Sequence, residues 1–66
     1  MIKKISGKEA LEIIEKKEPR GLFYYKLGKI YLGIDNSKGY AWTRRFKKLK
    51  LCKKWLIGEL TKWDNP

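Results

Sequence analysis

The chain of 66 residues contains no histidine, a single cysteine and two prolines. Without histidine it lacks the side chain that most often serves as a general base or metal ligand near neutral pH. Cys52 therefore has no imidazole to activate it as a nucleophile. Glycine-rich phosphate loops and dinucleotide-binding patterns are also missing from the sequence. We therefore expect a protein that is not an enzyme, with no catalytic residues, no metal site and no cofactor.

Acidic residues are scarce as well: seven Asp and Glu stand against 17 Lys and Arg, which gives a net charge of +10. Glu9, Glu12 and Glu15 recur every three residues among lysines, a spacing typical of a solvated helix face. Asp35 is followed by Asn36 in a turn-forming segment, where such side chains stabilise the backbone. These acidic residues therefore indicate a helix face and a turn. They do not indicate a metal site, because a metal site needs oxygen ligands that converge.

Long hydrophobic runs are missing too. The basic start at Met1 is followed by polar residues from Ser6, so we expect neither a signal peptide nor a membrane span. A lone Cys52 forms no intramolecular disulfide, which favours a reduced, cytosolic protein. Sixty-six residues make a single small domain (residues 1–66) with a modest core, for which three Trp, four Tyr and two Phe supply much of the packing.

The first helix is predicted from a capping box, S-x-x-E, formed by Ser6 and Glu9. The helix should begin at about Gly7. Pro19 disfavours helical geometry at Glu18 and should end the helix there. The apolar face of this helix would consist of Ala10, Leu11, Ile13 and Ile14.

From residue 21 to residue 46 the apolar period changes to two and aromatic and β-branched residues dominate. Glycine-bearing breaks interrupt this segment where hairpins would turn. We expect three antiparallel strands, at residues 22–26, 30–34 and 40–46.

Helical spacing returns after Phe46, with Leu49, Cys52, Leu56 and Leu60 on one stripe that is flanked by Trp55 and Trp63. The predicted fold class is α+β: a three-stranded antiparallel sheet packed against two helices, in the order α-β-β-β-α. Its core should include Leu11, Ile14, Leu32, Ile34, Cys52 and Leu56.

Strand alternation places Leu32 and Ile34 on the sheet face that the helices cover, and Tyr31 with Gly33 on a face open to solvent. One of Tyr24 and Tyr25 would join Tyr31 in an aromatic platform for unpaired bases. The alternative is that these rings belong to the core, as most aromatic residues of a small domain do.

Trp42 has the same two interpretations. It shares strand parity with Arg44 and Phe46, which is an awkward mixture for a fully buried face. Trp42 is therefore either a central core residue or, beside Arg44, part of an amphipathic recognition surface.

Cations are concentrated late in the chain. Residues 1–20 carry six cations and four acids (+2), and residues 21–66 carry 11 cations and three acids (+8). The run R-R-F-K-K-L-K-L-C-K-K has seven cations without an acid, including lysines near the positive end of the second helix, where they cost stability. Such a run either attracts a polyanion or is a solubilising surface. We predict nucleic-acid binding, DNA or RNA, through Arg44, Arg45, Lys47, Lys48, Lys50, Lys53 and Lys54, with Tyr31 or Trp42 supplying stacking.

Two resemblances bear on this prediction. The order helix, three strands, helix resembles the double-stranded RNA-binding domain, which has a basic cluster at the start of its second helix. Lys47, Lys48, Lys50, Lys53 and Lys54 lie near that place, whereas the family's histidine-bearing loop has no counterpart here. This resemblance is one of topology and implies an RNA-binding surface on the second helix.

The segments G-L-F-Y-Y-K, Y-L-G-I-D-N-S-K-G-Y-A-W and C-K-K-W-L are similar to short proteins of phages and mobile elements of Gram-positive bacteria. That resemblance implies a host-takeover or anti-defence accessory protein, a group that includes anti-CRISPR inhibitors. The alternative function is therefore an inhibitor of a host protein or ribonucleoprotein. Its basic face would engage an acidic partner and Trp42 or Tyr40 would anchor the complex. The oligomeric state stays open.

Overall fold

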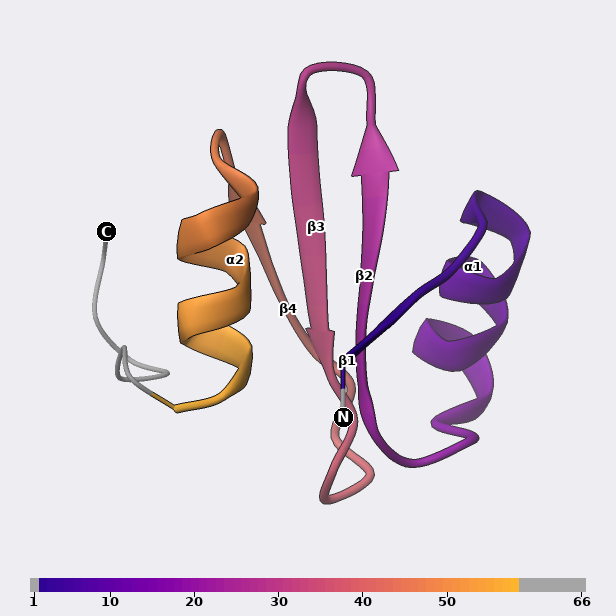
Figure 1. Cartoon of the computed structure of the whole chain (residues 1–66). Helices are drawn as coiled ribbons and strands as arrows, with labels where there is room; N and C mark the ends of the chain where they lie inside the picture. The colour runs from indigo at the N-terminus through magenta and orange to yellow at the C-terminus, as the bar shows by residue number, and fades with distance from the viewer. Residues whose placement is uncertain (1, 59–66) are drawn as a thin grey trace.

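The computed structural model describes residues 2–58, which form an α+β unit with a four-stranded mixed sheet between two helices (Figure 1). The strands are β1 (Ile2–Lys4), β2 (Leu22–Leu27), β3 (Ile30–Asp35) and β4 (Trp42–Phe46), and the helices are α1 (Gly7–Lys16) and α2 (Leu49–Leu56). The strands lie side by side in chain order, with β1 parallel to β2 and the other pairs antiparallel. None of the helices within residues 2–58 has the length and apolar character needed to span a membrane.

The predicted helix start is confirmed. The backbone N–H of Glu9 donates to the Ser6 hydroxyl at 3.2 Å, and the Ser6 N–H donates to the Glu9 carboxylate at 3.1 Å. These reciprocal bonds satisfy donors that a helix start leaves unpaired. The helix ends slightly earlier than predicted, at Lys16, because Lys17 adopts a left-handed conformation (φ 60°).

The strand β1 was not predicted, so the order α-β-β-β-α is incomplete. Ile2 pairs with Leu22 and Lys4 with Tyr24, which makes β1 a parallel neighbour of β2. A three-residue strand with two lysines is too short to show a period of two, and its pairing depends on where α1 returns the chain. The order of elements in residues 2–58 begins with a strand. It therefore differs from the order helix, three strands, helix, on which the likeness to the double-stranded RNA-binding domain rests.

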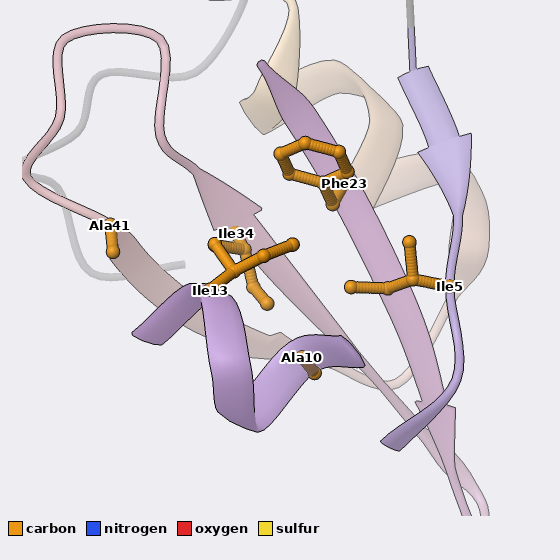
Figure 2. Close-up of a cluster of buried hydrophobic side chains, with 6 residues drawn as sticks. All are labelled: Ile5, Ala10, Ile13, Phe23, Ile34 and Ala41. Carbon is orange, nitrogen blue, oxygen red and sulfur yellow. The ribbon is translucent and has the colours of Figure 1, made fainter. Parts of the chain in front are cut away.

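The two helices cover opposite faces of the sheet, whereas we expected both on the Leu32 and Ile34 face (Figure 1). On the α1 face, Ala10 and Ile13 pack against Phe23 and Ile34 (Figure 2). Ile5 and Ala41 complete this buried cluster, and Ile14, Tyr25 and Leu32 lie half-buried against it.

On the other face, α2 buries Cys52, Trp55 and Leu56 together with Phe46. The half-buried side chains around this second cluster are Ile2, Leu22, Tyr24, Tyr31, Trp42 and Leu49. Our prediction failed because the sheet has two apolar faces. The face that we expected to be open to solvent carries enough apolar surface to pack against a helix, supplied by Phe46, Trp42, Tyr31 and Leu22.

Ile34, Cys52 and Leu56 are buried as predicted, and Leu32 and Ile14 are half-buried. The prediction that Leu11 lies in the core is wrong, since its side chain is 56% exposed. It lies about 100° around the helix from Ala10, and the strip of α1 that meets the sheet is too narrow to include it. Leu60 and Trp63, also expected along the α2 stripe, lie outside the described residues.

The last strand is shorter than predicted, beginning at Trp42 instead of residue 40. Ala41 has a φ of 48°, in the left-handed region, so the extended backbone cannot continue to Tyr40. The Asp35 and Asn36 turn is confirmed as a structural element: the Asp35 carboxylate accepts hydrogen bonds from the Ser37 N–H at 3.1 Å and from the Ser37 hydroxyl at 2.7 Å.

Candidate nucleic-acid interface

The basic run does not form one surface, because β4 alternates through it. Arg44 pairs with Gly33, whose face contacts α2, and Arg45 pairs with Leu32, which packs on the α1 side. Arg44 is half-buried and Arg45 is exposed. Adjacent arginines in the sequence are therefore directed to opposite faces of the sheet.

Two of the cations, Arg45 and Lys47, lie together at the β4 edge. Arg45, Phe46, Lys47 and Leu51 line a shallow hollow. Lys48 is the N-cap of α2 and, within the described residues, makes no side-chain capping hydrogen bond.

Three lysines project from α2 itself. Lys50 and Lys53 are exposed, and Lys54 is half-buried. Residues three and four positions apart lie on the same side of a helix, so Lys50 is a neighbour of both Lys53 and Lys54. These three cations give α2 a basic outer side above its buried Cys52 and Leu56.

Beside α2, the same sheet face carries tyrosines in contact with lysines. The ring centroids of Tyr24 and Tyr31 lie 6.4 Å apart, with planes inclined by 59°. The Lys53 ammonium lies 5.8 Å from the Tyr24 ring centroid, and the Lys26 ammonium lies 5.9 Å from that of Tyr31. Both distances fall in the range of cation–π interactions. With Lys4, which pairs with Tyr24, these residues form what we call the tyrosine–lysine surface: Lys4, Tyr24, Lys26, Tyr31 and Lys53.

Our sequence prediction identified only Tyr31 and Lys53 of this surface as site residues. The choice between Tyr24 and Tyr25 is resolved by the fold, since Tyr24 lies beside Tyr31 and Tyr25 packs on the α1 side. Tyr31 is half-buried beside α2 instead of standing on an open face.

Lys26 was missed because we placed residue 27 in the turn. Only Gly28 and Lys29 separate β2 from β3, and Gly28 has the positive φ (61°) that the first central position of a type II′ turn requires. A two-residue turn sets Lys26 opposite Tyr31 and Tyr24 opposite Gly33. This short turn was the signal in the sequence that would have located the surface.

Trp42 lies at the margin of the core. Its side chain is half-buried and packs against the cluster beneath α2, as a core residue does. It also stacks on Tyr40, with centroids 5.6 Å apart and planes inclined by 15°. Tyr40 is 62% exposed, so the pair extends from the core to the surface.

The Cys52 thiol is buried beneath α2 on this face. Burial raises the pKa of the Cys52 thiol to about 11, with the nearby Lys53 charge acting weakly in the opposite direction, so this thiol is protonated at neutral pH. Within residues 2–58 the His, Cys, Asp and Glu side chains form no group of three that could hold a metal ion.

No protein family, curated protein or solved structure matches this chain. The functional interpretation therefore depends on the side chains of the tyrosine–lysine surface and on the charge around it.

Proposed function

We propose that this protein is a non-enzymatic module that binds nucleic acid, DNA or RNA, through the α2 face of its sheet. Lys4, Lys26 and Lys53 contact phosphates, while Lys50 and Lys54 extend the positive field along α2. Tyr24 and Tyr31 supply ring surface for sugars or bases beside these contacts.

The observation that carries the proposal is the pairing of each tyrosine with a lysine. A lysine held 5.8 or 5.9 Å from a ring centroid keeps its ammonium group at a defined place on the surface. A phosphate bound there would lie next to the ring, which is the combination of charge and stacking surface that single-stranded and other nucleic-acid binders use. A merely solubilising surface needs no such pairing.

The net charge of +10 supports the same conclusion at longer range. A positive field raises the rate at which a polyanion encounters the protein, and release of condensed counterions then favours the complex. Because phosphate contacts carry no sequence information, we expect binding that tolerates many sequences.

The test is a titration of labelled oligonucleotides, single- and double-stranded, at several salt concentrations. Affinity should fall steeply as salt rises. Replacing Lys26 and Lys53 by Gln should reduce the slope of log affinity against log salt by about one per lysine.

The matched control replaces Lys8 and Lys16 by Gln, because both are exposed on α1 and their loss changes the net charge by the same amount. This control should leave the slope nearly unchanged. Failure of the unmodified protein to bind any oligonucleotide at low salt would refute the proposal, as would equal losses in the two double variants. A protein partner retained in pull-downs after nuclease treatment, together with no oligonucleotide binding, would support the inhibitor alternative instead.

A further inference from the structure

Tyr40 and Trp42 form a stacked pair at the end of the sheet where β3 is joined to β4. Their ring planes are inclined by only 15°, with centroids 5.6 Å apart. Trp42 is fixed by packing against the cluster beneath α2, while Tyr40 is 62% exposed. The pair is therefore anchored at one ring and presents the other to solvent.

The residue between them explains how the pair is held. Ala41 is buried in the cluster on the α1 face and has a φ of 48°, in the left-handed region. Residues other than glycine seldom adopt this conformation, and it persists where the surrounding structure holds it. At Ala41 the backbone therefore leaves the extended geometry of a strand. The stacking of Tyr40 on Trp42 is thus not the ordinary spacing of alternate side chains along a strand.

Asn36 supplies the restraint on Ala41. Its side chain is fully buried, and its Oδ1 accepts a hydrogen bond from the Ala41 N–H at 3.1 Å. Its Nδ2 donates to the Pro19 carbonyl at 2.7 Å, and its backbone N–H donates to the Gly21 carbonyl at 2.8 Å. The loop that presents Tyr40 is thus tied to the connection between α1 and β2, which makes the position of the ring part of the fold.

From this geometry we infer that Tyr40 is a stacking platform for an unpaired base, supported by Trp42, and that the protein prefers single-stranded nucleic acid to duplex. This inference rests on the proposed function and specifies its ligand. An ordered aromatic ring with an exposed side gains stacking contact only from a base whose own face is accessible. In a duplex the base faces are already stacked on their neighbours.

Positive charge on the sheet face that carries Trp42 favours a nucleotide over a neutral planar ligand. Trp42 pairs with Asp35 and Arg44 pairs with Gly33, so Trp42 and Arg44 lie on the same face of β4. With a nucleotide stacked at Tyr40, the phosphates along the strand pass a face that bears Arg44 and the lysines of α2. A stacked base and neighbouring phosphate contacts then act on one strand.

The experiment compares a single-stranded oligonucleotide, a hairpin duplex with the same number of phosphates, and a strand in which abasic residues replace the nucleotides. The unmodified protein should bind the base-containing strand more tightly than the other two. Tyr40→Ala should lower affinity for that strand about five- to hundredfold and leave duplex and abasic affinities within about twofold. Tyr40→Phe keeps the ring and should bind like the unmodified protein.

The matched control is Leu11→Ala, which removes another exposed apolar side chain, from α1 on the sheet face that Trp42 does not share, and should change none of the three affinities. The abasic strand makes the test independent of folding, because it removes the bases and leaves the protein intact. Equal affinity of the unmodified protein for base-containing and abasic strands would overturn the inference and leave the proposed function standing. Absence of binding to all three would overturn both.

Discussion

Gly33 determines how closely α2 approaches the sheet. A Cβ atom at this position would lie 3.1 Å from the Cys52 Sγ and 3.1 Å from a ring carbon of Trp55. Both of these side chains are almost completely buried, so neither has room to move away. A glycine at the centre of β3 is thus explained by the helix packed on it, although glycine usually weakens a strand.

We expect Gly33→Ala to destabilise the protein by about 1 to 3 kcal/mol, because the added methyl group overpacks the cluster beneath α2. Urea denaturation followed by tryptophan fluorescence would measure the change. Thr43→Ala is a suitable control, since Thr43 is an exposed residue of β4 and its loss should cost less than about 0.5 kcal/mol. A Gly33→Ala variant as stable as the unmodified protein would mean that α2 does not pack this closely on β3.

At the scale of elements, the sequence was most informative where a local signal has a local cause. The capping box of Ser6 and Glu9 located the start of α1, and the glycine-bearing turn located the hairpin of β2 and β3. The strand β1 was missed because its pairing with β2 depends on residues about 20 positions away. The placement of α2 on the opposite face was missed for a related reason: helical periodicity shows which side of a helix is apolar but not which sheet face it meets.

The capping box of α1 has a pH dependence that can be measured. The pKa of Glu9 lies below its ordinary value of 4.5. The hydrogen bond from the Ser6 N–H lowers this pKa most, and the hydrogen bond with the Ser6 hydroxyl lowers it further. A carboxyl group with a lowered pKa in the folded state contributes stability above the unfolded pKa, and that contribution is lost as the pH falls through the folded pKa. The stability of the protein should therefore decline as the pH falls below 4.5.

Two variants separate the parts of this box. Ser6→Ala should destabilise the protein by about 1 kcal/mol at neutral pH, because it removes the hydroxyl that accepts from the Glu9 N–H. Glu9→Gln keeps a hydrogen-bonding side chain without a titratable proton, so its acid-induced loss of stability should be smaller than that of the unmodified protein. Thermal melts between neutral pH and pH 3 would show both effects. Parallel acid profiles for the unmodified protein and Glu9→Gln would contradict the role given to Glu9.

For the whole molecule, the basic run of the sequence shows what composition can and cannot locate. Its high positive charge predicted the class of partner that we propose. It did not predict a surface, because Arg44, Arg45 and the lysines of α2 are distributed by the period of two in β4 and the period of 3.6 in α2. The tyrosine–lysine surface instead brings together β1, β2, β3 and α2, and Lys4 and Lys26 lie far from the run in sequence.

Arg44 and Arg45 allow a test of this arrangement with two variants that have the same composition and the same net charge as each other. Replacing either residue by Gln removes one positive charge, and the two positions are adjacent in the sequence. Arg44→Gln changes the face that carries α2 and the tyrosine–lysine surface, whereas Arg45→Gln changes the side occupied by Leu32. We expect Arg44→Gln to lower oligonucleotide affinity about tenfold, as loss of one charge-assisted phosphate contact would.

Arg45→Gln should lower affinity less than about threefold, because a charge directed away from the bound strand acts only through a screened field. Titration of one labelled oligonucleotide at a fixed salt concentration gives both values, and thermal melts show whether each variant is folded. The reverse order of effects would assign the interface to the hollow that Arg45 shares with Lys47 and Leu51 at the β4 edge. Equal effects would mean that binding responds to total charge alone, and the α2 face would then have no special role.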